Sequence, residues 1–323
     1  MRQSIRLVPG SRSIAPLSLA LAGLFASGCA TAANQNGGFY VDPDSNPAIW
    51  VRDHGGDARA AKIRASVSGK PMARWFGNWS GSIGSAVSRY VEAARSADKL
   101  PILVAYNIPG RDCGGHSGGG AGSPEAYRTW ISSFASGIGN TRAVVVIEPD
   151  ALAQLDCLPA DQRAVRTDLL KYAAREFKLR APNALVYHDG GNASWVPAEE
   201  MARRLHAAAA GEIRGFALNV SNYHTTADSN RYGAAVSAAL KNQFGYAKPF
   251  VVDTSRNGNG SNGEWCNPAG RKLGAVSQNS ASGAEMLLWV KVPGDSDGNC
   301  GIAPNTPAGT FSPDIATRLI DGR

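Results

Sequence analysis

Short runs of apolar, often β-branched residues alternate along the chain with longer stretches in which apolar positions recur at helical spacing. Because nearly every position of a run is apolar, each run predicts a strand that is buried on both faces. Strands that alternate with helices predict a parallel sheet with helices outside it. The predicted strands are Met72–Phe76, Ile102–Ile108, Ala143–Ile147, Ala184–Tyr187, Gly215–Val220, Phe250–Thr254 and Met286–Val290. The predicted helices are Ser82–Ala97, Pro124–Gly137, Asp161–Leu179, Pro197–Ala210 and Asn230–Phe244.

Seven predicted strands fit either an open doubly wound sheet or an irregular barrel, and the hydrophobic pattern does not separate the two. Polar or aromatic side chains stand at nearly every strand end, and in a (β/α) barrel these ends converge on one rim, where active sites form. We therefore expect an α/β fold: a distorted (β/α) barrel of about seven parallel strands, with its site at the strand C-terminal ends. The strand-end residues are Trp75, Asn107, Glu148, Asp150, Asp189, Asn219, Asn222, Asp253 and Lys291.

The first 33 residues differ from the rest of the chain. They hold three arginines and no acidic residue, and an apolar stretch runs through residues 14–25. This pattern is typical of an export signal and is too short for a stable membrane anchor. Residues 26–29 resemble a lipoprotein box, with alanine where leucine is usual. The sequence thus predicts either lipidation of Cys29 in the outer membrane, or secretion after ordinary cleavage at Ala30, Ala32 or nearby. No later apolar run is long enough to cross a membrane, and residues 34–323 are expected to form one domain.

Without the predicted signal, the net charge falls from +7 to +4. That charge is too weak and too scattered to predict nucleic-acid binding. Four cysteines remain of five: Cys113, Cys157, Cys266 and Cys300. An even number in an exported protein predicts two disulfides, and the sequence alone leaves three pairings open. No C-x-x-C or H-x-x-x-H spacing supports zinc, so we expect no metal site.

Three short segments match motifs of other functional classes. The glycines of residues 258–263 fit G-x-G-x-x-G, but residues 264–268 do not begin the helix that a dinucleotide site requires. Residues 295–299 begin like a calcium loop, yet the glycine is in fourth place and Thr306 replaces the bidentate glutamate. Residues 115–119 fit the nucleophile elbow of esterases around Ser117. The strand ends well before them, at Ile108, but an esterase that uses Ser117 remains the alternative from another enzyme class.

The richer signal is a set of carboxylates at strand ends. Asp150 ends a very apolar strand, where partial desolvation raises the pKa of an acid and keeps it protonated near neutrality. The competing interpretation is that Asp150 caps the following helix. Asp112 lies in the loop after the preceding strand, Asp189 ends another strand, and Asp297 follows the last one. Glycosidases need a protonated carboxyl on one side of the bond, and inverting ones use a carboxylate on the other side.

Tryptophans stand beside these carboxylates. Trp75, Trp195 and Trp265 each lie at or just beyond a strand end. Exposed indoles bind the apolar faces of pyranose rings, whereas a core role would bury them, as is usual for large aromatic residues. Their position next to glycines and acids favours sugar binding.

Several segments in this order resemble signatures of glycoside hydrolase family 6, the inverting cellulases. The resemblance covers roughly residues 39–310, and it implies a distorted barrel of about seven strands. It also implies a monomeric catalytic domain without a cofactor, which cleaves internal bonds of a β-1,4-glucan with inversion. A cellobiohydrolase of the same family is the alternative. The matching segments are Tyr106–Cys113, Val146–Leu152, Asp253–Gly258, Glu264–Cys266, and Leu288–Lys291 with Asp297–Gly298.

The resemblance also implies roles. Asp150 matches the general acid, and Asp112 matches the carboxylate that supports it and relays a proton from the nucleophilic water. Asp297 matches the candidate base, an assignment that is unsettled within the family. Asp189 matches a carboxylate that shapes the environment of the acid, and Tyr106 matches a tyrosine that crowds the sugar at the cleavage point. The implied substrate-binding residues are Trp75, Trp195, Trp265, Lys291, Asn222 and Asp295.

The resemblance further pairs Cys113 with Cys157 and Cys266 with Cys300, so that each bridge would hold a loop that carries an acid. Two positions depart from the family pattern: Asn192 replaces a common histidine, and Asp295 replaces a common glutamate. The segments 253–272 and 292–304 are short for a roof over the site. We therefore expect an open cleft and internal cutting.

Overall fold

The computed structural model describes residue 4 and residues 38–280 and 282–323. The predicted export signal, apart from Ser4, and the predicted lipidation or cleavage near Cys29 lie outside the described residues. Among the residues described, no helix has the length and apolar character needed to cross a bilayer.

The strands form one sheet in the order β1-β2-β3-β4-β5-β6-β8-β7. Seven of them run parallel to their neighbours, as predicted, while the short β7 pairs antiparallel with β8. The sequence could not predict β7, because it is two exposed polar residues with no apolar pattern. The strands are β1 Arg74–Phe76, β2 Ile102–Ala105, β3 Val144–Ile147, β4 Leu185–Asp189, β5 Gly215–Leu218, β6 Phe250–Asp253, β7 Gln278–Asn279 and β8 Met286–Leu288.

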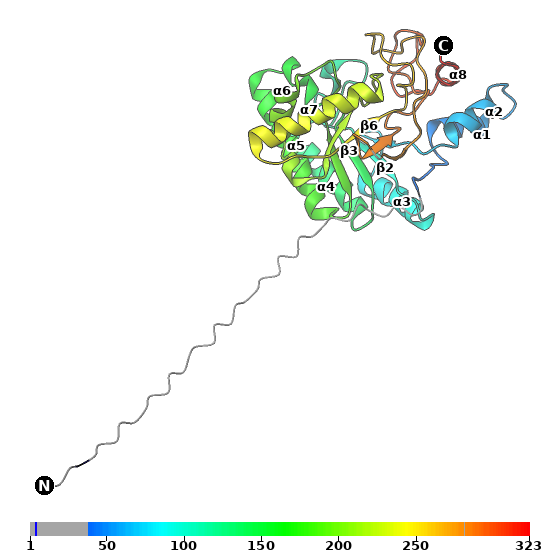
Figure 1. Ribbon diagram of the computed structural model, residues 1–323. Helices are drawn as coiled ribbons and strands as arrows, with labels where there is room; N and C mark the ends of the chain where they lie inside the picture. The colour runs from blue at the N-terminus through cyan, green and yellow to red at the C-terminus, as the bar shows by residue number, and fades with distance from the viewer. Residues whose placement is uncertain (1–3, 5–37, 281) are drawn as a thin grey trace. The chain divides into compact units, whose positions relative to one another are not determined.

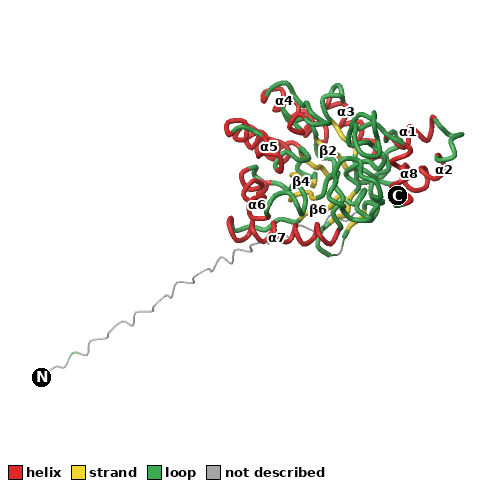
Figure 2. The backbone as a smooth tube through the Cα atoms, turned by 90° about the horizontal axis from the view of Figure 1, so that it is seen from above, coloured by secondary structure: helices red, strands yellow, loops and turns green. Residues whose placement is uncertain are grey.

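The sheet curls around a core of its own. Side chains from six strands, including Val104, Val146 and Val251, meet inside it. A larger apolar cluster fills the layer between the sheet and the surrounding helices, which form an arc around the strands in Figure 2. The strands therefore have two buried faces, which explains their uninterrupted apolar runs.

The five predicted helices are present on the outside of the sheet (Figure 1). Helix α7 begins four residues earlier than predicted because the Thr225 hydroxyl caps it, accepting a hydrogen bond from the Asp228 N–H. Its polar first turn carries no apolar pattern. The helices are α3 Ile83–Ser96, α4 Pro124–Ile138, α5 Ala160–Arg180, α6 Ala198–Ala207 and α7 Thr226–Phe244.

The sequence analysis missed three further α-helices: α1 Asn46–Asp53, α2 Ala60–Ile63 and α8 Pro313–Asp321. They lie together on the opposite side of the sheet from α5 and α6 (Figures 1 and 2). Apolar residues from this region, among them Val51 and Ala316, bury the indole of Trp289 just beyond β8.

The barrel closes only loosely between its first and last parallel strands. In the described part of the chain, β1 and β8 form no ladder, and a backbone hydrogen bond joins the residues next to them, from the Ala73 N–H before β1 to the Trp289 carbonyl after β8 at 2.9 Å. The Trp75 indole N–H adds a second tie, to the Val290 carbonyl at 2.8 Å. The fold is thus the expected distorted barrel, with a seam held by a few hydrogen bonds instead of a strand pair.

Candidate active site

The four predicted acids follow four of the parallel strands and lie close enough to act on one another. Asp112 follows β2, Asp150 follows β3, Asp189 ends β4 and Asp297 follows β8. Burial is the largest cause that raises the pKa of Asp150 well above its usual value, and the charges of Asp189, Asp112 and Asp297 raise it further. The strand ends therefore bring all four carboxylates together at the rim.

Asp150 is held in an unusual backbone conformation. Its φ is +69°, and that of Glu148 is +48°, a region that non-glycine residues rarely adopt. The Asp150 N–H donates to Asp189 Oδ2 at 2.9 Å, and the Gly191 N–H donates to the same oxygen at 3.0 Å. The next helical turn, η3 (Ala153–Cys157), has Leu152 at its N-cap and no side-chain cap. The structure therefore gives no support to Asp150 as a helix cap.

Asp150 and Asp189 form a tightly coupled, desolvated pair. Burial raises the pKa of Asp189 to about 7, although two backbone N–H groups oppose that rise. Asp189 Oδ1 is buried and has no partner among the described residues. Two neighbouring carboxyl groups cannot both ionise cheaply, so Asp150 is kept protonated near neutrality. This is the state that a proton donor needs.

Asp112 is fixed by neutral donors. It lies in the short turn η2 (Asp112–Gly114), with a φ of +55°. Its Oδ2 accepts the Ser117 N–H at 2.7 Å, and its Oδ1 accepts the Gln154 amide at 3.3 Å. The disulfide between Cys113 and Cys157 ties η2 to η3, the turn that follows Asp150. The pairing implied by the family resemblance is therefore present, and it holds two acids beside each other.

Ser117 does not have the geometry of an esterase nucleophile. It lies in an irregular loop, and helix α4 begins only at Pro124. The sharp strand–serine–helix turn of a nucleophile elbow is therefore missing at this position.

Asp297 has the opposite electrostatic environment. Its Oδ2 accepts from Arg256 Nη1 at 2.8 Å, and its Oδ1 lies 3.2 Å from Lys291 Nζ. The Tyr223 hydroxyl and the Asn267 N–H also donate to Oδ2, at 3.2 and 3.1 Å. Burial would raise the pKa of this carboxyl, but Arg256 and Lys291 outweigh burial and lower it to about 2. Asp297 is therefore ionised throughout the ordinary pH range.

Asp295 and Asn222 were expected to contact the substrate. Asp295 is buried, with Oδ2 accepting from the Asn46 amide at 2.8 Å and Oδ1 without a partner in the described residues. Burial raises the pKa of Asp295 to about 7. Asn222 is half-buried, and its amide donates to the Val220 carbonyl at 3.2 Å. Because Asp297 already pairs with two cations, residues 295–299 do not offer a free set of calcium ligands.

Aromatic side chains stand at the same rim. Tyr106 is buried, and the half-buried Trp75 contacts its ring edge-on at a centroid distance of 5.1 Å. Trp195 and Trp265 are 41% and 56% exposed, so neither is a core residue. The guanidinium of Arg111 lies over the rings of both Tyr106 and Trp79.

The sequence analysis missed Trp79, which is 56% exposed beside Arg111. It follows the end of β1 by three residues, so the signal used for the other tryptophans would have found it. It also missed Arg256, the buried partner of Asp297. No local pattern marks an arginine in an irregular loop as the partner of an acid 41 residues away.

Two further buried carboxylates organise the rim by accepting backbone N–H groups. Glu148 accepts the N–H groups of Asn107 and Ile108, at the end of β2, at 2.9 Å each. Asp253 accepts four backbone N–H groups, from the residues after β5, β6 and β8, at 2.9–3.2 Å. Sequence analysis placed both acids at strand ends but gave them no role. They join neighbouring strand ends that the sheet hydrogen bonds no longer connect.

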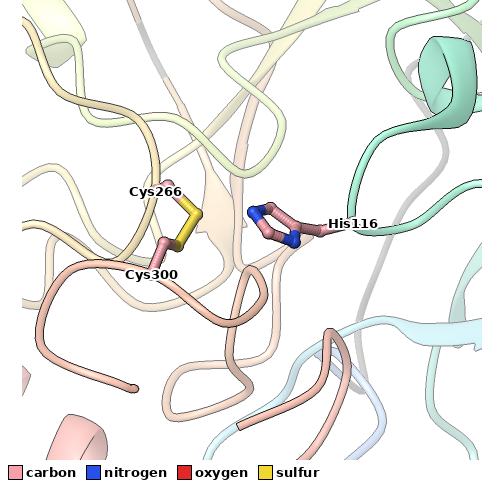
Figure 3. Close-up of side chains that lie close together, drawn as sticks. All are labelled: His116, Cys266 and Cys300. Atoms are coloured by element: carbon pink, nitrogen blue, oxygen red, sulfur yellow. A yellow bond between two sulfur atoms is a disulfide. The ribbon is translucent and has the colours of Figure 1, made fainter. Parts of the chain in front are cut away.

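Loops from the two sides of the seam between β1 and β8 meet at His116. Its ring points toward the disulfide between Cys266 and Cys300 (Figure 3), and its centroid lies 6.1 Å from that of Trp265. A ligand atom of each of the three residues falls within 4.8 Å of the others. The sulfur atoms are bonded to each other, so they offer no thiolates to a metal ion. The loop after β2 thus contacts the loops after β6 and β8.

Comparison with known proteins places these features in context. The model of the glycosyl hydrolases family 6 matches residues 35–323. Endoglucanase 1 of Streptomyces halstedii is 52% identical over 96% of this chain and 97% of its own. Endoglucanase A of Cellulomonas fimi is 45% identical over 87% of this chain and 60% of its own. The solved endoglucanase Cel6 of Mycobacterium tuberculosis, in complex with a methyl-cellobiosyl-thio-cellobioside, superposes with a TM-score of 0.81 at 40% identity. That match covers 88% of this chain and 96% of the solved one.

Proposed function

The chain belongs to the glycosyl hydrolases family 6, and we propose that it is an endo-β-1,4-glucanase with Asp150 as its general acid. The reaction is the hydrolysis of internal β-1,4-glucosidic bonds of a cellulose-like glucan with inversion at the anomeric carbon. The observation that carries the proposal is the contrast between two acids at one rim. Asp150 is kept protonated, and Asp297 is kept ionised. An inverting glycosidase needs one carboxyl group in each state.

Asp150 donates its proton to the oxygen of the leaving sugar. Its raised pKa keeps the proton available, and the charges of Asp112 and Asp189 raise the free energy of the ionised form. Because the Asp189 carboxylate also binds the Asp150 N–H, it fixes the backbone from which the acid reaches. Asp189 is therefore a positioning residue as well as an electrostatic one.

A water molecule attacks the anomeric carbon from the opposite face and must lose a proton. A carboxylate with a pKa of about 2 accepts a proton weakly, so Asp297 is a poor base while Arg256 and Lys291 bind it. Among the residues that the structure describes, the donors to Asp112 are the neutral Ser117 N–H and Gln154 amide. We assign the proton of the water to Asp112 through intervening water, with Asp297 orienting the nucleophile.

The aromatic residues bind and distort the glucan. Exposed Trp195, Trp265 and Trp79 offer flat apolar faces to pyranose rings, whereas Tyr106 is packed rigidly between Trp75 and Arg111. A rigid ring at the cleavage point favours a distorted sugar, which resembles the oxocarbenium-like transition state. Lys291, Asn222 and Asp295 supply polar groups to the same surface.

Product analysis tests this proposal. Hydrolysis of carboxymethyl cellulose should lower viscosity well before many reducing ends appear, because internal bonds are cut. Proton NMR should first detect the inverted α anomer. Almost pure cellobiose with little loss of viscosity would favour the cellobiohydrolase alternative, and a β anomer as first product would contradict the mechanism. Ser117→Ala should retain full glucanase activity, whereas hydrolysis of an acyl ester that is lost in this variant would favour the esterase alternative.

We further propose that the protein is exported and acts as a monomer. Two disulfides support export, because such bonds persist in oxidising compartments. Mass spectrometry of the mature N-terminus distinguishes a lipidated Cys29 from an ordinary cleaved end. A cytosolic protein that keeps all of residues 1–33 would contradict the export proposal.

A further inference from the structure

A buried arginine of an outer helix reaches the loop that carries Asp112. Arg166 lies in the second turn of α5, and its side chain is only 3% exposed. Its Nη2 group donates to the carbonyls of Pro109 and Gly110, at 2.9 and 2.7 Å. These two residues lie between the end of β2 and Asp112. Helix α5 therefore holds the start of an active-site loop.

Arg166 is a buried cation that hydrogen-bonds backbone carbonyls. Its Nη1 group is buried and has no hydrogen-bond partner in the described part of the chain. Burial is the largest cause that lowers the pKa of Arg166, because the charged form loses its solvent. Buried charged groups can often be replaced by apolar residues of similar size without loss of stability. Packing alone therefore does not explain an arginine at this position, whereas a hold on the loop does.

The backbone of this loop needs such a hold. Gly110, Asp112 and Cys113 have φ values of +63°, +55° and +47°. Glycine adopts this conformation readily, but in other residues it persists only where the surrounding structure imposes it. The disulfide of Cys113 with Cys157 fixes the chain just after Asp112. Arg166 fixes the chain just before it, so Asp112 is held from both sides.

Both contacts come from the segment that follows Asp150. Cys157 lies in η3, and Arg166 lies in the helix after it. Gln154, also in η3, donates to the Asp112 carboxylate itself. The position of Asp112 relative to the general acid is thus fixed by contacts that η3 and α5 supply.

We propose that Arg166 is a positioning residue for Asp112 in the removal of the proton from the nucleophilic water. This inference rests on the proposed function, in which Asp112 accepts that proton through intervening water. Misplacement of a catalytic group by about 1 Å can lower a rate about 10²-fold, and a chain of water molecules needs hydrogen-bond distances at every step. Because Arg166 is buried, it acts on the position of Asp112 and not on the binding of the glucan.

Replacement of Arg166 tests its effect on the rate. Arg166→Met removes every donor, and we expect kcat on carboxymethyl cellulose to fall about 10–100-fold while KM changes less than about twofold. Arg166→Lys keeps a charged donor nitrogen and should restore most of the rate. Arg175→Met, the same change at an exposed position of α5, should retain full activity. An unchanged kcat in Arg166→Met, or an effect confined to KM, would overturn the proposal.

The leaving group shows which acid Arg166 serves. An aryl cellobioside with a good leaving group needs little help from Asp150, but the attacking water must still lose its proton. The loss caused by Arg166→Met should therefore be about equal on this substrate and on carboxymethyl cellulose. A loss that disappears on the aryl substrate would assign Arg166 to Asp150 and overturn the proposal.

A double-variant cycle separates positioning from general damage to the fold. Asp112→Asn leaves no carboxylate to position, so adding Arg166→Met should lower kcat by less than about twofold more. Circular dichroism verifies that each variant is folded, and Arg166→Gln replaces Arg166→Met in the cycle if the latter is not. Equal losses with and without Asp112 in an active enzyme would refute the role of Arg166 alone. An unaltered chain that cleaves no β-1,4-glucan would refute the proposed function as well.

Discussion

Asp150 and Asp297 are the same residue type at the same rim, and burial raises the pKa of both, yet they end in opposite protonation states. The difference lies in their neighbours. The charges of three carboxylates, Asp189, Asp112 and Asp297, raise the pKa of Asp150, and Lys291 opposes them. Asp297 instead pairs with Arg256 and Lys291. Desolvation alone therefore does not make an acid catalyst, because the sign of the surrounding charge decides which carboxyl keeps its proton.

The site has two halves, Asp150 with its neighbouring acids and Asp297 with its cationic partners, and each half affects the other. The negative charge of Asp297 is one of the causes that raise the pKa of Asp150, and the positive charge of Lys291 lowers it. The ionised half thus helps to keep the other half protonated. Changing the residues around one acid and measuring the protonation of the other tests this dependence.

The largest effect is expected from Asp150→Asn, which removes the proton donor but keeps the shape of the side chain. We expect kcat on carboxymethyl cellulose to fall by about 10³–10⁴-fold, since general acid catalysis supplies 10²–10⁴-fold and the leaving sugar is a poor one. An aryl cellobioside with a good leaving group should lose much less rate. Asp161→Asn, an exposed change on α5, is the matched control and should retain full activity. Full cellulase activity in Asp150→Asn would refute the assignment.

The next largest effect is expected from breaking the ion pair of Asp297 with Arg256. Arg256→Gln leaves Asp297 buried beside a single cation, and loss of one partner of a buried ion pair costs about 3–5 kcal/mol of unfolding free energy. Urea unfolding measures this loss. The exposed pair of Arg203 and Glu200 provides the control, since Arg203→Gln should cost less than about 1 kcal/mol. Similar losses in the two variants would mean that Arg256 does not hold Asp297 as described.

The coupling between the halves predicts pH shifts of opposite sign. Because Asp150 must be protonated, kcat/KM falls as the pH rises through its pKa. Asp297→Asn removes a charge that raises the pKa of Asp150, so the alkaline limb should move to lower pH. Lys291→Met removes a charge that lowers this pKa, so the limb should move to higher pH. The residual activity of each variant on a soluble substrate suffices for the profile, and shifts of the same sign would contradict the coupling.

The smallest effect is expected outside both halves. Trp79→Ala removes an exposed indole near Arg111 and should raise KM severalfold with little change in kcat, because stacking on a sugar stabilises the bound substrate and the transition state equally. Leu179→Ala, which changes an exposed apolar residue on α5, should leave both constants unchanged. A fall in kcat with constant KM would place Trp79 in the reaction instead.

Much of the fold could be predicted from the sequence because burial on both faces leaves an apolar run at each parallel strand. Val144–Ile147 is the clearest example. The missed helices are of another kind. Helix α1 carries only two buried residues, and it is placed by its packing around Trp289, a contact between distant parts of the chain. Periodicity contains no information about such a contact.

The site shows the same division. Asp150, Asp189 and Asp112 could be predicted as a group because strand order alone brings them to one rim. The environment of Asp297 could not be predicted in this way, because Arg256 reaches it from one irregular loop and Tyr223 reaches it from another. The sequence indicates which residues lie at the rim, but loop conformation decides which charged residues become their neighbours.

The buried carboxylates at the strand ends make the fold more stable at acidic than at neutral pH. Glu148 and Asp189 have pKa values of about 7, chiefly because they are buried, and burial also raises the pKa of Asp253. A carboxyl whose pKa is higher in the folded than in the unfolded protein contributes stability that is lost as the pH rises toward the folded value. Raising the pH from about 4 to about 7 therefore weakens the rim, and most of the loss is complete above pH 7. Stability at neutral pH would gain from neutral amides such as Gln or Asn at these positions.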